Sequence, residues 1–114
     1  MELDAKHLYK EKIYQRVFCN KFNGEVEYVL SDKTRVDCLT SLYAIEVDFA
    51  NKWAESIGQS LYYGMMTERQ SGVLLIIEQD TLNLKYLKRL KLVADEVDIV
   101  IWTINKKMVI KRIK

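Results

Sequence analysis

Proline is absent from this sequence, cysteine occurs twice and histidine once. Without proline the chain contains no stiff linker, which favours a compact fold of mostly regular structure. Cys19, Cys38 and His7 have neither the spacing of a zinc site nor enough thiols for a disulfide framework. We therefore expect reduced cysteines that fill the core, a surface histidine, and a cytoplasmic, intracellular protein.

Long hydrophobic runs are also missing. No apolar stretch approaches the roughly 20 residues that a membrane-spanning helix needs, so no membrane association is expected. The first twelve residues lack the apolar segment of a signal peptide. A length of 114 residues fits a single domain over residues 1–114 with its own hydrophobic core.

Charge is unevenly distributed, although the formal net charge is only +2. Residues 1–84 carry nine basic and thirteen acidic side chains, whereas residues 85–114 carry nine basic and three acidic ones. This separation suits a protein that holds a cation at one place and a polyanion nearby. A lysine-rich helix and tail in contact with solvent explain the charges equally well. The bases considered for nucleic-acid contact are Lys88, Arg89, Lys106 and Lys107.

Hydrophobic periodicity predicts helices and strands in alternation. Residues 3–20 should form a helix with Tyr9, Ile13 and Val17 in its buried stripe, which Tyr14 and Phe18 widen. Later elements are expected as strands at 25–30, 34–40 and 42–49, a helix at 51–66, a strand at 72–78, a helix at 84–93, and strands at 98–103 and 108–113. An antiparallel meander followed by crossover units implies an α/β fold, with helices flanking a mixed β-sheet in three layers.

The buried stripes of the later helices follow from the same periodicity. The second helix should bury Trp53, Ile57, Leu61 and Met65, and the third should bury Leu84, Leu87 and Leu90. The second helix is expected to begin with Asn51 as its N-cap.

Acidic residues interrupt two of the apolar strands. Asp37 lies on the second predicted strand, and Glu46 and Asp48 share one face of the third because side chains alternate along a strand. An uncompensated charge in such a strand is costly, so a divalent cation nearby is the expected compensation. In the simpler alternative, Asp37 is an exposed acid beside Arg35 and Asp48 only helps to start the next helix.

Polar residues recur on the second predicted helix. Lys52, Glu55, Gln59 and Tyr63 follow the acids at helical spacing. Lys52 and Glu55 also fit an ordinary surface ion pair. Gln59 and Tyr63 equally fit a helix surface and the edge of the core.

This order of elements and acids resembles the PD-(D/E)xK nuclease superfamily over about residues 5–103, with a restriction-endonuclease-like αβββαβ core. Asp37, at the end of Arg35-Val36-Asp37, matches the acid of its second strand. Ile45-Glu46-Val47-Asp48 matches the acid-x-lysine element of its third strand. Gln59-Ser60-Leu61-Tyr62-Tyr63 looks like the QxxxY motif of the RecB-like branch, and the whole is similar to Holliday-junction resolvases.

The resemblance implies metal-dependent hydrolysis of phosphodiester bonds in DNA. Asp37, Glu46 and the backbone carbonyl of Val47 would hold one or two Mg²⁺ or Mn²⁺ ions. Glu11 or Glu27 would add a further ligand, since related nucleases often carry an acid on the first helix. The ion would lower the pKa of a bound water and neutralise charge on the phosphate.

Asp48 stands where the superfamily pattern has lysine. Lys52, one helical turn later, would position the attacking water in its place, leaving Asp48 as an extra ligand or as the base. Gln59 would hydrogen-bond a ligating carboxylate or the DNA backbone. If Lys52 does not reach the site, the alternative is a degenerate nuclease-fold protein that binds nucleic acid or a partner protein.

The resemblance also shapes the expected partners. Tyr63 and the four bases named above would contact DNA, and RNA remains an alternative substrate. So short a chain has little room for a domain that reads sequence, which favours recognition of DNA structure. A homodimer would enlarge the contact surface and place two sites on two strands.

Overall fold

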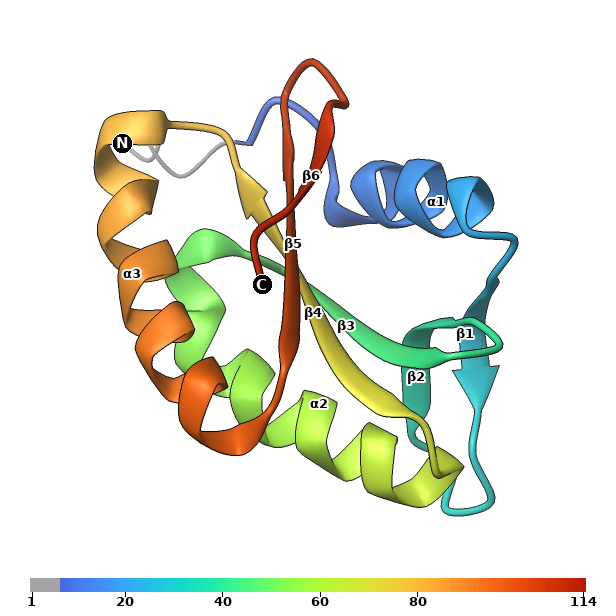
Figure 1. Cartoon of the computed structure of the whole chain (residues 1–114). Helices are drawn as coiled ribbons and strands as arrows, with labels where there is room; N and C mark the ends of the chain where they lie inside the picture. Colours follow the sequence, from blue (N-terminus) through green and yellow to red (C-terminus); the bar gives the residue numbers. More distant parts are fainter. Residues whose placement is uncertain (1–6) are drawn as a thin grey trace.

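The computed structural model describes residues 7–114, apart from the side chains of residues 80–82, as one six-stranded mixed sheet with three α-helices (Figure 1). The strands lie side by side in their chain order. The meander β1–β3 is antiparallel, β3, β4 and β5 run parallel, and β6 is antiparallel to β5. The elements are α1 (Glu11–Lys21), β1 (Glu25–Val29), β2 (Arg35–Leu39), β3 (Tyr43–Phe49), η2 (Ala50–Lys52), α2 (Trp53–Thr67), β4 (Gln70–Ile77), α3 (Asp80–Val97), β5 (Val100–Asn105) and β6 (Ile110–Arg112).

The sheet separates two hydrophobic layers. Helix α1 covers one face, where Tyr14 and Phe18 pack against residues of β3, β4 and β5. Helices α2 and α3 cover the other face, where Leu90 packs against Val73 and Leu75 of β4 (Figure 1). Strand β4 is apolar on both sides because both of its faces are covered. The α/β class, the mixed sheet with helices on both faces and the αβββαβ element order are therefore confirmed.

The predicted buried face of the first helix was right only in part. Tyr14 and Phe18, which widened the predicted stripe, face the sheet, whereas Tyr9, Ile13 and Val17 at its centre are exposed. Both sets repeat every four residues, so periodicity alone does not choose between them, and the two aromatic rings bury the larger apolar area. The helix begins at Glu11, and residues 3–6 of the prediction lie outside the described part of the chain.

The other two helices also differ from their predicted patterns. Met65 of α2 and Leu84 of α3 are exposed, not buried. Helix α2 approaches β4 through small residues: a Cβ on Gly64 would lie 2.0 Å from the Ser71 Oγ. Asn51 lies in η2, and the capping position of α2 is Lys52, which makes no side-chain capping bond. None of the helices within residues 7–114 is long and apolar enough to cross a membrane.

The expectation of reduced cysteines was wrong as well. Cys19 at the end of α1 and Cys38 on β2 form a disulfide, with a Cα–Cα distance of 5.7 Å. The turn between α1 and β1 packs against this bond, because a Cβ on Gly24 would lie 2.6 Å from the Cys19 Sγ and 2.7 Å from the Cys38 Sγ. The two cysteines are 19 residues apart, and only the packing of α1 on the sheet brings them together.

Candidate active site

Strands β2 and β3 part at the position of the predicted acids. Their register pairs Leu39 with Ala44 and Cys38 with Ile45, and its continuation would place Asp37 opposite Glu46. In place of a backbone acceptor from β2, the Val47 N–H donates to the Asp37 Oδ2 at 2.8 Å. The carboxylate of Asp37 thus lies in the gap between the two strands.

Three carboxyl groups meet in this gap. Glu46 lies within hydrogen-bonding reach of both Asp37 and Asp48. Glu46 and Asp48 are buried, at 5% and 7% exposure, and Asp37 is half-buried. Alternation along β3 puts Glu46 and Asp48 on the same face, as the sequence predicted. The structure therefore brings the three strand acids together.

Burial and mutual repulsion change the protonation of all three groups. Burial raises the pKa of Glu46, and the charges of Asp37 and Asp48 raise it further. Burial also raises the pKa of Asp48, to about 7, although the hydrogen bond with Glu46 opposes this. The pKa of Asp37 is raised by burial against the opposing effect of the Val47 N–H. The cluster therefore retains protons near neutral pH unless a cation replaces them.

The donor atoms around the gap are of the chemical type that a divalent cation prefers. Among the described residues, the Asp48 Oδ2 is buried without a hydrogen-bond partner. The Val47 N–H points at Asp37, and a residue's N–H and C=O face the same neighbouring strand, so the Val47 carbonyl also faces the gap. Carboxylate and carbonyl oxygens are the ligands that Mg²⁺ and Mn²⁺ prefer.

The side chains are not fully arranged as ligands. Within residues 7–114, no group of three or more His, Cys, Asp or Glu side chains has the arrangement needed to hold a metal ion. The set of Asp37, Glu46 and the Val47 carbonyl uses only two such side chains. Metal ligation by these residues stays a prediction.

Both predicted auxiliary acids lie beside Asp37. Burial and the charge of Asp37 raise the pKa of Glu11, and Glu27 adds to this effect. Glu27 occupies the β1 position opposite Asp37 and has a φ of 54°, a left-handed conformation that is costly for a residue other than glycine. Such strain is concentrated at functional sites. The sequence presented the two glutamates as alternatives, but the structure brings in both.

Gln15 joins α1 to these acids, and the sequence did not identify it. Its Nε2 donates to the backbone carbonyl of Asp37 at 2.7 Å and to the Glu27 Oε2 at 2.9 Å. Gln15 is 3% exposed. A glutamine beside Tyr14 at the buried face of a helix is the signal that could have revealed it, had that face been assigned correctly.

Lys52 lies at the edge of the cluster. It is exposed at the end of η2, and its positive charge lowers the pKa of both Asp48 and Glu11. No ion pair between Lys52 and Glu55 is present among the described residues. The position of Lys52 is therefore compatible with a role beside the acids.

Gln59 and Tyr63 occupy different environments on α2. Gln59 is exposed and hydrogen-bonds none of the described carboxylates. Tyr63 is buried at 7% exposure, and its pKa is raised by burial and then by the charges of Glu46 and Asp37. Tyr63 thus forms a wall of the cluster and is not an exposed surface for nucleic acid.

The four predicted DNA-contacting bases fall into two places. Lys88 and Arg89 are exposed on α3, with the Arg89 guanidinium 5.8 Å from the Tyr86 ring. Lys106 and Lys107 lie in the turn between β5 and β6, where they line a pocket of about 430 Å³ at the ends of β4 and β5.

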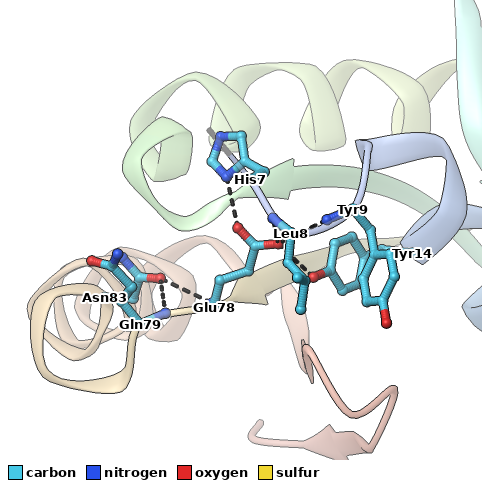
Figure 2. A network of polar contacts seen from close by, with 7 residues as sticks. All are labelled: His7, Leu8, Tyr9, Tyr14, Glu78, Gln79 and Asn83. Atoms are coloured by element: carbon cyan, nitrogen blue, oxygen red, sulfur yellow. Dashed lines mark hydrogen bonds and ion pairs between the residues drawn. The ribbon is translucent and has the colours of Figure 1, made fainter. Parts of the chain in front are cut away.

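A second polar network lies at that end of the sheet, and the sequence gave no sign of it (Figure 2). Glu78, just after β4, accepts hydrogen bonds from His7, Leu8, Tyr9 and Tyr14. The Asn83 side chain accepts hydrogen bonds from the backbone N–H groups of Glu78 and Gln79. The segment before α1 is thereby fixed to the end of β4, 69 to 71 residues away in sequence.

No family model, curated protein or solved structure matches this chain at a significant level. The resemblance to the nuclease superfamily therefore depends on residues, element order and geometry.

Proposed function

We propose that this protein is a metal-dependent nuclease of the PD-(D/E)xK superfamily that hydrolyses phosphodiester bonds of DNA. The observation that carries the proposal is the carboxyl cluster of Asp37, Glu46 and Asp48 in the gap between β2 and β3. Two buried acids beside a half-buried one destabilise a fold unless protons or a cation neutralise them. This energetic cost favours a functional role for the three acids over a purely structural one.

Asp37, Glu46 and the Val47 carbonyl are the residues that would hold Mg²⁺ or Mn²⁺, with Glu11 nearby. The bound ion supplies Lewis acidity, which lowers the pKa of water and neutralises charge on the phosphate. Lys52 contacts the phosphate or orients the attacking water from the exposed edge of the cluster. Asp48 would add a further ligand through its Oδ2, which has no hydrogen-bond partner among the described residues. Gln15 holds Asp37 and Glu27 in place.

The substrate and partners follow from the remaining surface. Lys106 and Lys107, in the β5–β6 turn, provide positive charge for a DNA backbone, and a homodimer would place two sites on two strands. The intracellular location expected from free thiols loses that premise, because disulfides are more common in oxidising compartments.

Cleavage of plasmid and branched DNA, and of an RNA control, in Mg²⁺ or Mn²⁺ tests the proposal. We expect Asp37→Ala and Glu46→Ala to abolish cleavage, because each removes a ligand, and Glu25→Ala on exposed β1 to retain it. Full activity in both variants would refute the site. DNA binding by the wild type without cleavage would instead support the degenerate nuclease-fold alternative.

A further inference from the structure

Helix α1 presents a basic surface to solvent. The helix and its N-cap residue carry one acid, Glu11, and four exposed bases: Lys10, Lys12, Arg16 and Lys21. Acids outnumber bases over residues 1–84 as a whole, so this excess of positive charge belongs to α1 itself. A local cluster of bases on one helix suits a polyanionic partner.

Two of these bases line a pocket between α1 and β1, the strand at the edge of the sheet (Figure 1). Lys12 and Arg16 are four residues apart, so they project from the same side of the helix. Together with Gln15, Val26 and Glu27 they line a space of about 130 Å³, which we call the α1–β1 pocket. At roughly 30 Å³ for each water, this space holds about four, the number of oxygen atoms in a phosphate group.

The charge of the α1–β1 pocket is positive because the acid that lines it is already compensated. The Glu27 Oε2 accepts a hydrogen bond from the Gln15 Nε2 at 2.9 Å, and the Glu27 Oε1 lies 3.6 Å from the Arg35 guanidinium. Lys12 and Arg16 form no ion pair with any residue from 7 to 114. Within that part of the chain, both cations are thus available to an anion that enters from solvent.

Gln15 connects the α1–β1 pocket to the candidate active site. It lines the pocket, and its Nε2 donates to the backbone carbonyl of Asp37 at 2.7 Å. The Asp37 carboxylate in turn accepts from the Val47 N–H in the gap between β2 and β3. A single side chain therefore separates a ligand in the pocket from the backbone of Asp37.

Composition favours a nucleic acid over a protein as the partner of this surface. Lysine is depleted in protein interfaces, whereas Lys10, Lys12 and Arg16 surround the apolar side chains of α1 that reach solvent. These apolar side chains, Ile13 and Val17, are each only 37% exposed. They offer little area to a protein partner, and the charge suits a phosphate backbone.

We propose that Lys12 and Arg16 bind a backbone phosphate of the DNA substrate in the α1–β1 pocket and hold the strand against α1. The assignment rests on the function proposed above, which supplies DNA as the ligand. The guanidinium of Arg16 matches two phosphate oxygens, and Lys12 adds a point charge. This phosphate is a neighbour of the one that is cleaved, since neither Glu46 nor Asp48 lines the pocket.

The double variant Lys12→Gln with Arg16→Gln tests the assignment. Fluorescence anisotropy with labelled DNA in EDTA, over a series of salt concentrations, measures binding without cleavage. We expect the slope of log affinity against log salt to fall by about 1, the value for one phosphate contact. In cleavage assays KM should rise with kcat unchanged, because a contact to a neighbouring phosphate is equally strong in the ground state and the transition state.

Two further variants separate this contact from a general effect of charge. Arg16→Lys keeps the positive charge and should retain the wild-type salt slope, although it loses the bidentate geometry. Lys21→Gln removes a charge from the same helix outside the pocket and should leave the slope unchanged. A loss in Lys21→Gln equal to that in Arg16→Gln would overturn the pocket as the binding site. All three side chains are exposed, so the melting temperatures should match that of the wild type.

The outcomes distinguish this surface from the nuclease function. An unchanged affinity and salt slope in the double variant would overturn the role of Lys12 and Arg16, whether or not the wild type cleaves DNA. A wild type that binds but never cleaves, with a reduced slope in the double variant, would support the binding surface and overturn the nuclease function alone. A wild type that binds no DNA at low salt would overturn both.

Discussion

The adjacent strands β3 and β4 are equally buried but carry different chemistry. Their register sets Glu46 beside Val73 and Asp48 beside Leu75, and all four residues are buried. Val73 and Leu75 pack against α3, whereas the two acids border the gap that opens where β2 leaves β3. Burial alone therefore does not decide whether an acid is tolerated. Strand β2 parts from β3 on one side, and the resulting gap leaves room for protons, water or a cation.

An acid transferred to β4 should break this comparison most strongly. We expect Leu75→Asp to lower the free energy of unfolding by about 4 kcal/mol or more, because no gap is present to compensate the charge. Urea unfolding at pH 8, with and without Mg²⁺, measures the effect. Leu75→Asn, which is similar in size to Asp but uncharged, separates the charge from the lost packing. A stable Leu75→Asp protein would contradict the comparison.

The disulfide fastens the strand that leaves β3, and its removal should have the next largest effect. Replacing both Cys19 and Cys38 by Ala should lower the free energy of unfolding by about 3 kcal/mol, as expected for a loop of this length. Urea unfolding with and without dithiothreitol provides the measurement. Dithiothreitol should destabilise the wild type but leave the stability of the double variant unchanged. If the wild type and the double variant are equally stable without dithiothreitol, the Cys19–Cys38 disulfide does not form.

Protonation of the cluster should make the free energy of unfolding fall as pH rises, whereas most acids in folded proteins have the opposite effect. Folding raises the pKa of Glu46 above its ordinary value of 4.5. The contribution of the bound proton to the free energy of unfolding is therefore fully present below pH 4.5. It is lost as the pH rises towards the pKa that Glu46 has in the folded protein. Without metal, we expect the wild type to be more stable at pH 5 than at pH 8.

Glu46→Gln sharpens the same point. It should stabilise the metal-free protein at pH 8 by about 1–3 kcal/mol, the free energy of one to two pKa units. Mg²⁺ should raise the melting temperature of the wild type at pH 8, less at pH 5, and not that of the variant. Glu25→Gln on exposed β1 is the control. A melting temperature that ignores both pH and Mg²⁺ would contradict a functional cluster.

The smallest expected effect concerns the two groups of bases. Lys106→Gln with Lys107→Gln should reduce the slope of log affinity against log salt by about 1–2, because these lysines lie at the same end of the sheet as the segment that leads into α1. The pair Lys88→Gln and Arg89→Gln on α3 should change the slope less. Fluorescence anisotropy with labelled DNA in EDTA measures both, and the reverse order would place DNA over α3.

Local pattern was enough to predict the element order and the acid pair of β3. The continuous apolar run of β4 and the alternation around Glu46 each depend on neighbours within a few residues. The centre of the buried face of α1 was misplaced, because Ile13 and Val17 repeat at the same spacing as Tyr14 and Phe18. The choice between these pairs is made by the shape of the sheet, to which distant strands contribute.

The parts of the site that were missed all depend on contacts between distant segments. Gln15 reaches Asp37 across 22 residues, and His7 reaches Glu78 across 71. The cysteine pair became a disulfide only because α1 packs on β2. Nothing in the local sequence around these residues encodes their partners, whereas the strand acids were visible because they violate the apolar pattern of their own segment.

Helix α1 is anchored at both of its ends. The segment before it is bound to Glu78, and Cys19 near its last turn is covalently joined to β2. Glu11 and Gln15 lie between these two anchors. Their backbone has already lost its conformational freedom when the chain folds, so a ligand that meets them needs to order less of the protein, and more of the interaction energy remains for binding.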